Sequence, residues 1–363
     1  IIQIADITGA WGVSFLLMLV NVIIYSVVCH KSYVVSFTRR YLLSILCVIG
    51  VLGYGYFRMY YPLLTAHNIP FLTISVIQGN IPQELKWTPE ATSYILDKYT
   101  KLTEQAARLS PDLIVWPEAA SPELLGESKL TFEKIFSLAK ATKAHLLIGA
   151  VVNDNEKYFN SALLINNQGK IAGRYDKLHL VPFGEYIPLK RILPFLQTIV
   201  PIGDITAGRE YTIFKMPNPR HPFLENFAVL ICFEDLFPEL SQQFSKNGAQ
   251  FLVNITNDAW YKKTSAASQH LQASVFRAVE NRVYMVRAAN TGISGFIAPS
   301  GQIFSLVQDK VGRNIFIDGY LTEDISTETR RGLGFYTRYG DIFVIICILF
   351  VLYCIIRTLK NQP

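Results

Sequence analysis

Long apolar runs without a charged residue lie near both ends of the sequence, and they constrain the fold more than any other feature. Residues 11–28 are eighteen consecutive uncharged positions, residues 41–57 are seventeen, and residues 342–356 are fifteen. A helix of about 20 apolar residues crosses the hydrocarbon core of a bilayer. We therefore predict two membrane helices before the central segment and a third after it, with buried core helices as the alternative.

The central segment, from Phe71 to Thr322, alternates short β-rich runs with amphipathic helical stretches, a pattern typical of an α/β layered domain. We expect strands at 72–78, 113–116, 145–152, 158–165, 171–175, 227–232, 251–256, 283–288, 295–297 and 314–320, and helices at 88–109, 130–142, 238–246 and 265–281. Residues 322–334 are predicted to link this domain to the last membrane helix. The chain is thus divided into membrane helices in 1–68, an enzyme domain in 69–325, and a linker with the last membrane helix in 326–363.

Three reactive side chains follow strand-like runs of the central segment: Glu118, Lys177 and Cys232. Cys232 precedes two acidic residues typical of a first helical turn, so we expect its thiol at a strand-to-helix elbow, where a helix N-terminus favours the thiolate. A carboxylate could take the thiol proton, and an ammonium could hold the negative charge that develops on a carbonyl oxygen. Each residue also has an ordinary structural interpretation, and it is their co-occurrence that predicts nucleophilic catalysis.

The residue composition argues against a metal site, a cofactor site and a nucleic-acid-binding site. The other four cysteines lie in or beside the apolar runs, which leaves Cys232 as the single cysteine of the central segment. The six histidines lack the paired spacing of metal ligands, so we predict neither a metal nor a cofactor. The net charge of +6 comes without a basic cluster interleaved with aromatic residues, which favours attraction to anionic lipids over nucleic-acid binding.

The order of Glu118, Lys177 and Cys232, each on its own strand-and-helix unit, resembles the nitrilase (carbon–nitrogen hydrolase) superfamily. The surrounding sequence resembles the apolipoprotein N-acyltransferase family within it. The resemblance rests on QGNIPQELKW at 78–87, WPE at 116–118, HLVPFGEYIP at 179–188, ICFED at 231–235, NDAW at 257–260 and NTGISGFIAPSG at 290–301.

This resemblance implies a fold, an αββα sandwich of two sheets between helix layers, together with transmembrane helices. It also implies roles for five residues: Cys232 as the acylated nucleophile, Glu118 as the general base, Lys177 as the oxyanion stabiliser, Glu185 as a second carboxylate beside that lysine, and Glu234 as a further essential acid. The sequence departs from the family at Phe233, where many members have tyrosine.

Candidate substrate-binding residues are Trp87, Phe233, Asn257, Trp260 and Tyr186. The tryptophans could stack against acyl chains or a peptide, and the asparagine could orient the substrate; ordinary aromatic packing and turn formation are the alternatives. Tyr186 lies in the apolar segment from Val181 to Gly203, which contains four prolines. Beside a membrane, such a segment is a candidate lid or lipid-contacting arm, or else a buried loop.

The resemblance implies transfer of a fatty-acyl chain from phosphatidylethanolamine, through a cysteine thioester, to the N-terminal amine of the diacylated cysteine of an apolipoprotein. It also implies a monomer in the bacterial inner membrane, with its enzyme domain on the periplasmic side. Lysine and arginine counts near the membrane helices favour this orientation by five to four. Because the sequence begins at Ile1 without methionine, directly before an apolar run, we expect further membrane helices upstream.

Two other functions compete with acyl transfer. A membrane-tethered amidase or nitrile hydrolase would use the same three residues, with water resolving the thioester. An inactive lipoprotein-binding scaffold would not need the three reactive residues, all of which are present.

Overall fold

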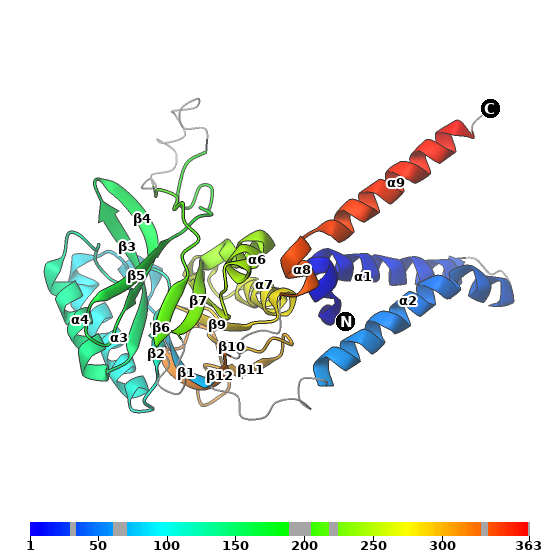
Figure 1. Ribbon diagram of the computed structural model, residues 1–363. Coiled ribbons are helices and arrows are strands. Elements are labelled where there is room, and N and C mark those ends of the chain that lie inside the picture. The colour runs from blue at the N-terminus through cyan, green and yellow to red at the C-terminus, as the bar shows by residue number, and fades with distance from the viewer. Residues whose placement is uncertain (30–33, 61–70, 189–204, 218–223, 328–332, 362–363) are drawn as a thin grey trace.

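The structure of the chain is a computed structural model that describes residues 1–29, 34–60, 71–188, 205–217, 224–327 and 333–361, with 34–41 described by their backbone only. Figure 1 shows a layered domain of sheets and helices and, on one side of it, a group of long helices that extend away from it. Short 3-10 helices complete the described secondary structure, at Ile2–Ile4, Gln83–Leu85, Pro89–Ala91, Cys232–Leu236 and Asp258–Tyr261.

Within the described residues, the strands form two six-stranded sheets. The first has the order β12-β1-β2-β3-β4-β5, made of Gly319–Ser326, Phe71–Gln78, Leu113–Val115, His145–Asp154, Lys157–Ile165 and Ile171–Asp176. The second has the order β11-β10-β9-β8-β7-β6, made of Ile303–Leu306, Gly295–Ile297, Tyr284–Ala289, Phe251–Thr256, Leu224–Ile231 and Phe214–Pro217. Strands β1, β2 and β3 are parallel to one another, as are β7, β8 and β9.

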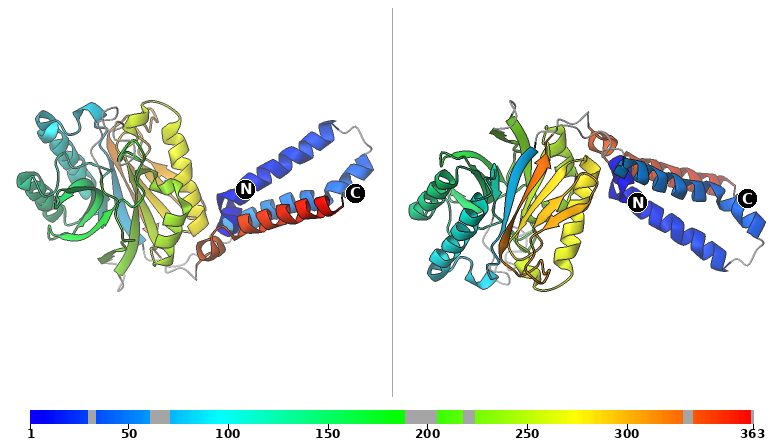
Figure 2. Two further views of the ribbon diagram at one scale, coloured as in Figure 1. Left: turned by 90° about the horizontal axis from the view of Figure 1, so that it is seen from above. Right: turned by 90° about the horizontal axis from the view of Figure 1, so that it is seen from below.

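Each sheet is covered on its outer face by helices, which gives four layers (Figure 2). Helices α3 (Thr92–Ala107) and α4 (Lys129–Thr142) pack on the first sheet, and α6 (Pro238–Lys246) and α7 (Ala266–Asn281) on the second. Alternation along β2 explains the layering: Leu113 and Val115 belong to the core between the sheets, whereas Ile114 packs under the helices. The predicted αββα sandwich is confirmed.

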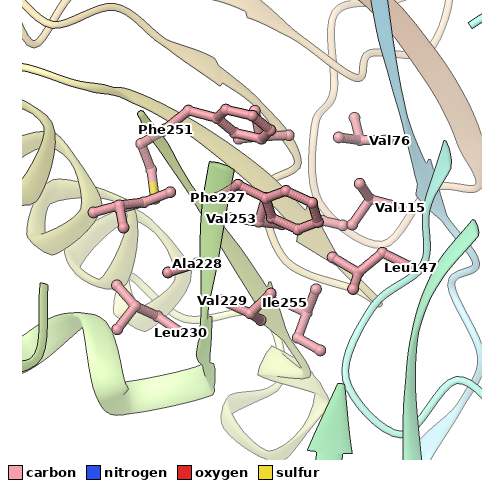
Figure 3. Close-up of a cluster of buried hydrophobic side chains, with 14 of the residues drawn as sticks. Val76, Val115, Leu147, Phe227, Ala228, Val229, Leu230, Phe251, Val253 and Ile255 are labelled. Carbon is pink, nitrogen blue, oxygen red and sulfur yellow. The ribbon is translucent and has the colours of Figure 1, made fainter. Parts of the chain in front are cut away.

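The core between the sheets is built from branched and aromatic side chains. Figure 3 shows Val115 and Leu147 of the first sheet lying opposite Phe227 and Ile255 of the second. The ring of Phe227 stacks on those of Phe214 and Phe251, with centroids 5.1 Å apart in both pairs. This packing fixes the distance between the two sheets, and with it the distance between the strand ends that carry the reactive side chains.

Each of the three predicted apolar runs lies in a long helix: α1 (Ala5–Cys29), α2 (Val34–Tyr60) and α9 (Ile342–Lys360). Within the described part of the chain, three helical stretches are long and apolar enough to cross a membrane, Ile2–Cys29, Leu42–Tyr60 and Ile342–Lys360. Most of their described apolar side chains are exposed, as for Leu43, which is 82% exposed. The helices extend from the same side of the domain, next to α7 and the short α8 (Phe335–Tyr339) (Figures 1 and 2).

The prediction was wrong at the edges of the sheets. The last strand, β12, covers Gly319–Ser326, although residues 314–320 were expected to be a strand and 322–334 a linker. Strands β6 and β11 were not predicted. All three are edge strands, which have one neighbour and are only partly buried, so their sequences lack the apolar runs of the central strands.

Candidate active site

The carboxyl ends of three strands bring the predicted reactive residues into one cavity. Strand β5 is antiparallel to β4, which is antiparallel to β3, so β5 runs in the same direction as β2 and ends at the same edge. Glu118 follows β2, Lys177 follows β5, and Cys232 follows β7 of the facing sheet. All three line a cavity of about 730 Å³.

Lys177 is held by two carboxylates. Its ammonium lies 2.8 Å from Oε2 of Glu185 and 3.7 Å from Oε1 of Glu118, and the side chain is 1% exposed. Burial lowers the pKa of Lys177, but the charges of Glu118, Cys232 and Glu185 outweigh it and hold the pKa above its ordinary value. The lysine therefore stays cationic inside the cavity, where a positive charge acts most strongly on a developing oxyanion.

Asn160, in the middle of β4, was not predicted as a site residue. Its Nδ2 donates to Oε1 of Glu118 and to Oε1 of Glu185, both at 2.8 Å. The backbone carbonyl oxygen of Asn160 also accepts the backbone N–H of Lys177 at 2.9 Å. One side chain thus sets the separation of the two carboxylates on either side of the lysine.

Cys232 lies at the predicted elbow, in a constrained conformation. Its φ of 55° is in the left-handed region, which is uncommon for a residue with a side chain. The strain is compensated by hydrogen bonds to its carbonyl oxygen, from Nδ2 of Asn254 at 3.0 Å and from the ring Nε2 of His270 at 3.3 Å.

The expectation that the helix N-terminus favours a thiolate was wrong. The helix that begins at Cys232 is a 3-10 helix of five residues, too short for a substantial dipole. Burial, and next the charge of Glu118, raise the pKa of the Cys232 thiol well above its ordinary range, against the charge of Lys177. The resting thiol is therefore protonated, and a base has to take its proton during attack.

Glu234 lies beneath the cavity instead of lining it. Its fully buried carboxylate accepts hydrogen bonds from the Tyr175 hydroxyl at 2.9 Å and from the backbone N–H groups of Leu178 at 2.7 Å, His179 at 3.0 Å and Ile231 at 2.8 Å. Burial raises the pKa of Glu234 to about 7, although these donors oppose the shift. Glu234 thus ties the loop after Lys177 to the end of β7, directly before Cys232.

A second buried polar cluster supports the nucleophile from behind. The ring of His270 lies 2.9 Å from Asp235 and 2.8 Å from Asp258, and both carboxylates also contact Arg287. Burial and Arg287 lower the pKa of His270, but the two aspartates prevail and raise it to about 9. The cluster therefore pairs two anions with two cations.

Four of the five predicted substrate-binding residues line the cavity: Trp87, Phe233, Asn257 and Trp260. Trp260 is 68% exposed and Trp87 43%, so apolar rings stand at the cavity rim. Asn257 is fixed by hydrogen bonds to Gln83 and Asn290. Tyr186 is not among the described lining residues; its backbone carbonyl accepts the N–H of Phe183, which does line the cavity.

The apolar segment predicted as a lid is only partly described. Residues 181–185, which include Glu185, line the cavity. Residues 189–204 lie outside the described residues. Lys86 is a further lining residue that was not predicted to act in the site, although it lies within the QGNIPQELKW segment.

The sequence matches known proteins over most of its length. The pattern of the carbon-nitrogen hydrolase family matches residues 73–326. An apolipoprotein N-acyltransferase of Rickettsia prowazekii is 30% identical over 97% of this chain and 68% of that protein. This chain belongs to the apolipoprotein N-acyltransferase family. The predicted resemblance is confirmed.

Another apolipoprotein N-acyltransferase, from Geobacter metallireducens, is 38% identical over 96% of this chain and 65% of its own length. The chain therefore spans about two thirds of the length of these two curated relatives. Family membership, together with helices long and apolar enough to cross a bilayer, makes the chain a membrane protein.

Solved structures share the fold at low identity. An amidase from Nesterenkonia sp. matches 74% of this chain and 97% of its own, with a TM-score of 0.53 and 17% identity. A carbon-nitrogen hydrolase from Helicobacter pylori G27 matches 72% of this chain and 91% of its own, with a TM-score of 0.54 and 15% identity. These likenesses concern the nitrilase-like fold alone.

Proposed function

We propose that the chain is the acyl-transferring part of an apolipoprotein N-acyltransferase that works through a thioester on Cys232. The observation that carries this proposal is the meeting of Glu118, Lys177 and Cys232 in one cavity whose rim exposes Trp87 and Trp260. A buried thiol needs an adjacent base, and a fatty-acyl substrate needs an apolar approach. Both are combined here with helices able to cross a bilayer.

In the first half-reaction, the thiol proton of Cys232 passes to the carboxylate of Glu118 while sulfur attacks an ester carbonyl carbon of a membrane phospholipid. The carbonyl electrons move to oxygen, and Lys177 stabilises the oxyanion. When the tetrahedral intermediate collapses, the ester C–O bond breaks and the leaving oxygen takes the proton from Glu118. A lysophospholipid departs, and Cys232 carries the acyl chain. We take phosphatidylethanolamine as the donor.

In the second half-reaction, a primary amine attacks the thioester carbonyl and gives a proton to Glu118. The C–S bond breaks, the thiolate leaves and regains this proton, and the acyl chain ends as an amide. We take the acceptor to be the N-terminal amine of the diacylated cysteine of an apolipoprotein. Because the two substrates react in turn at one cysteine, the kinetics should be ping-pong.

The remaining residues support these groups. Glu185 compensates the buried charge of Lys177 and orients it at 2.8 Å. Glu234 fixes the two strand ends relative to each other, and Phe233, Asn257 and the rim tryptophans contact the substrate. We place the enzyme as a monomer in the bacterial inner membrane, with the cavity on the periplasmic side.

The test is intact-mass measurement of the full-length protein after incubation with phosphatidylethanolamine. Wild type should gain one fatty-acyl mass, and Cys232→Ala and Glu118→Gln should not. Addition of a diacylated lipopeptide should then discharge the adduct into a triacylated product. Release of free fatty acid in place of the amide would support the hydrolase alternative, and the absence of any adduct on wild type would reject the thioester route.

A further inference from the structure

Lys86 is a buried cation of the cavity that the mechanism above does not use. It follows the 3-10 helix Gln83–Leu85, lines the same cavity as Cys232, and is 8% exposed. Its ammonium donates to the carbonyl oxygens of Glu118 at 3.3 Å and of Ala119 at 3.2 Å. Among the residues that the structure describes, no carboxylate forms an ion pair with it. A buried ammonium bound only to neutral carbonyls is costly and requires an explanation.

The two carbonyls belong to the turn that presents the proposed base. Ala119 has a φ of 45°, a left-handed conformation that is unfavourable for alanine. In this conformation the carbonyls of Glu118 and Ala119 both reach the ammonium of Lys86. The lysine thus compensates the backbone strain of the turn and fixes the point from which the Glu118 side chain extends.

The charges of the cavity wall give the second argument. In the described part of the chain, the charged residues that line the cavity are two carboxylates, Glu118 and Glu185, and two ammoniums, Lys177 and Lys86. With Lys86 the wall is electrically neutral; without it, the wall carries one net negative charge. A net negative charge opposes both a thiolate on Cys232 and an oxyanion on the substrate.

We propose that Lys86 is a positioning residue of the acyl-transfer site, whose ammonium fixes the Glu118 turn and supplies the second positive charge that ionisation of Cys232 requires. The inference rests on the proposed function for its place in the reaction. When the thiol proton moves from Cys232 to Glu118, the negative charge moves from the carboxylate to sulfur. The ammonium of Lys86 attracts the negative charge at both positions. The lysine itself forms and breaks no covalent bond.

The acid–base behaviour of Lys86 agrees with this geometry. Burial lowers its pKa to about 8, against the charges of Glu118 and Cys232, which raise it. The lysine is therefore mostly charged at neutral pH and loses its charge under mildly alkaline conditions. The buried Tyr99 also lies close to Lys86, at the smaller void that both residues line. Its raised pKa leaves it neutral over the same range of pH.

The test measures the reactivity of the Cys232 thiol without any phospholipid. The full-length protein is alkylated with iodoacetamide between pH 6 and 10, and the rate at the Cys232 peptide is read by mass spectrometry. Three variants are compared with wild type: Lys86→Met, which keeps the length of the side chain but removes the charge, Lys86→Arg, which keeps a charge at all these pH values, and Lys101→Met, an exposed lysine of α3 as the control.

We expect Lys86→Met to slow alkylation of Cys232 at pH 7 by about tenfold, since loss of a nearby cation raises the thiol pKa. Lys86→Arg should react within about threefold of wild type, and Lys101→Met like wild type. The wild-type rate should also flatten above pH 8 as Lys86 loses its charge, whereas the Lys86→Arg rate should keep rising.

A folded Lys86→Met variant with the wild-type rate would overturn the proposal, because a purely structural lysine would leave thiol ionisation unchanged. If Lys86→Met does not fold, the decision rests on Lys86→Arg: a rate ten times slower than wild type, or the same flattening above pH 8, would equally overturn it. These readouts do not depend on acyl transfer. Failure to form an acyl adduct on wild type would reject the proposed function and leave the result on thiol ionisation intact.

Discussion

The carboxylate of Glu234 accepts the backbone N–H of Leu178 at 2.7 Å, which joins the short helix that begins at Cys232 to the loop after Lys177. The two strand ends belong to different sheets, and this contact crosses from one sheet to the other. Further donors from Tyr175 and Ile231 saturate the same carboxylate. Glu234 therefore holds the proposed nucleophile and the proposed oxyanion cation in register.

We predict that Glu234→Gln lowers both stability and activity. A glutamine replaces one acceptor oxygen with an NH2 group that faces backbone donors, and such a mismatch costs about 2–3 kcal/mol of unfolding free energy. Denaturant unfolding in detergent measures the loss, with Glu239→Gln on the exposed surface of α6 as the matched control. Equal stability of the two variants would show that Glu234 does not join the strand ends.

Asn160 offers a test of polarity within the site. Asn160→Leu, of similar size, removes the donor shared by Glu118 and Glu185, and we expect acylation of Cys232 to slow by about 100-fold, as when one preorganised donor is lost. Asn160→Asp should be slower still, because it places a third carboxylate beside the other two. Single-turnover acylation by phosphatidylethanolamine measures both. An aspartate variant faster than the leucine variant would contradict this assignment.

The apolar central strands and the positions of the reactive residues could be predicted, because both leave local signals. Buried parallel strands read as continuous apolar runs, and Glu118 and Cys232 follow two such strands, β2 and β7. Lys177 follows the antiparallel edge strand β5. The edge strands β6 and β11 were missed because each has only four residues and is partly buried, and β12 was misplaced because its pairing depends on a segment far away in the sequence. In β12, Ile325 pairs with Leu72 across more than two hundred residues.

The supporting residues were missed for a related reason. Asn160 reads as one polar position in a strand, and its role arises only because the fold brings Glu118, after β2, and Lys177, after β5, into contact with it. Lys86 reads as a turn lysine, and its burial depends on how the chain folds over the Glu118 turn. The prediction of a thiolate at Cys232 was wrong because burial raises the thiol pKa more than a short helix can lower it. Burial of one residue cannot be read from the local sequence.

The raised pKa of His270 predicts an alkaline loss of stability. Since its pKa rises from 6.5 to about 9 on folding, the stabilisation is complete below pH 6.5 and is lost as pH rises through about 9. This difference between the pKa of His270 in the unfolded and folded states corresponds to about 3 kcal/mol of unfolding free energy. Denaturation midpoints of wild type should therefore fall between pH 7 and 10. His270→Gln should be less stable at pH 7, and its denaturation midpoint should fall less between pH 7 and 10. An equally steep fall in the variant would mean that another group causes the alkaline loss of stability.

The last prediction concerns the junction between the helices and the enzyme domain. Asp6 in α1 lies 2.9 Å from Arg58 of α2 and 2.8 Å from Arg282, which follows α7, and its carboxylate also accepts the Tyr54 hydroxyl. Asp6→Asn leaves two cations facing each other in a largely buried junction, which should lower the unfolding free energy by about 3 kcal/mol. Hydrogen exchange should then increase at the start of α1 and the end of α7.

The exposed Asp97→Asn in α3 provides the control for this substitution and should leave both regions protected. Alkylation of Cys232 should be unchanged in Asp6→Asn, because the junction lies on the helix side of the second sheet and the cavity lies at the strand ends. Increased exchange confined to the junction would mean that Asp6 docks the membrane helices on the domain without shaping the cavity. Unchanged exchange would mean that apolar packing of α1 on α7 is sufficient, with Asp6 adding little to it.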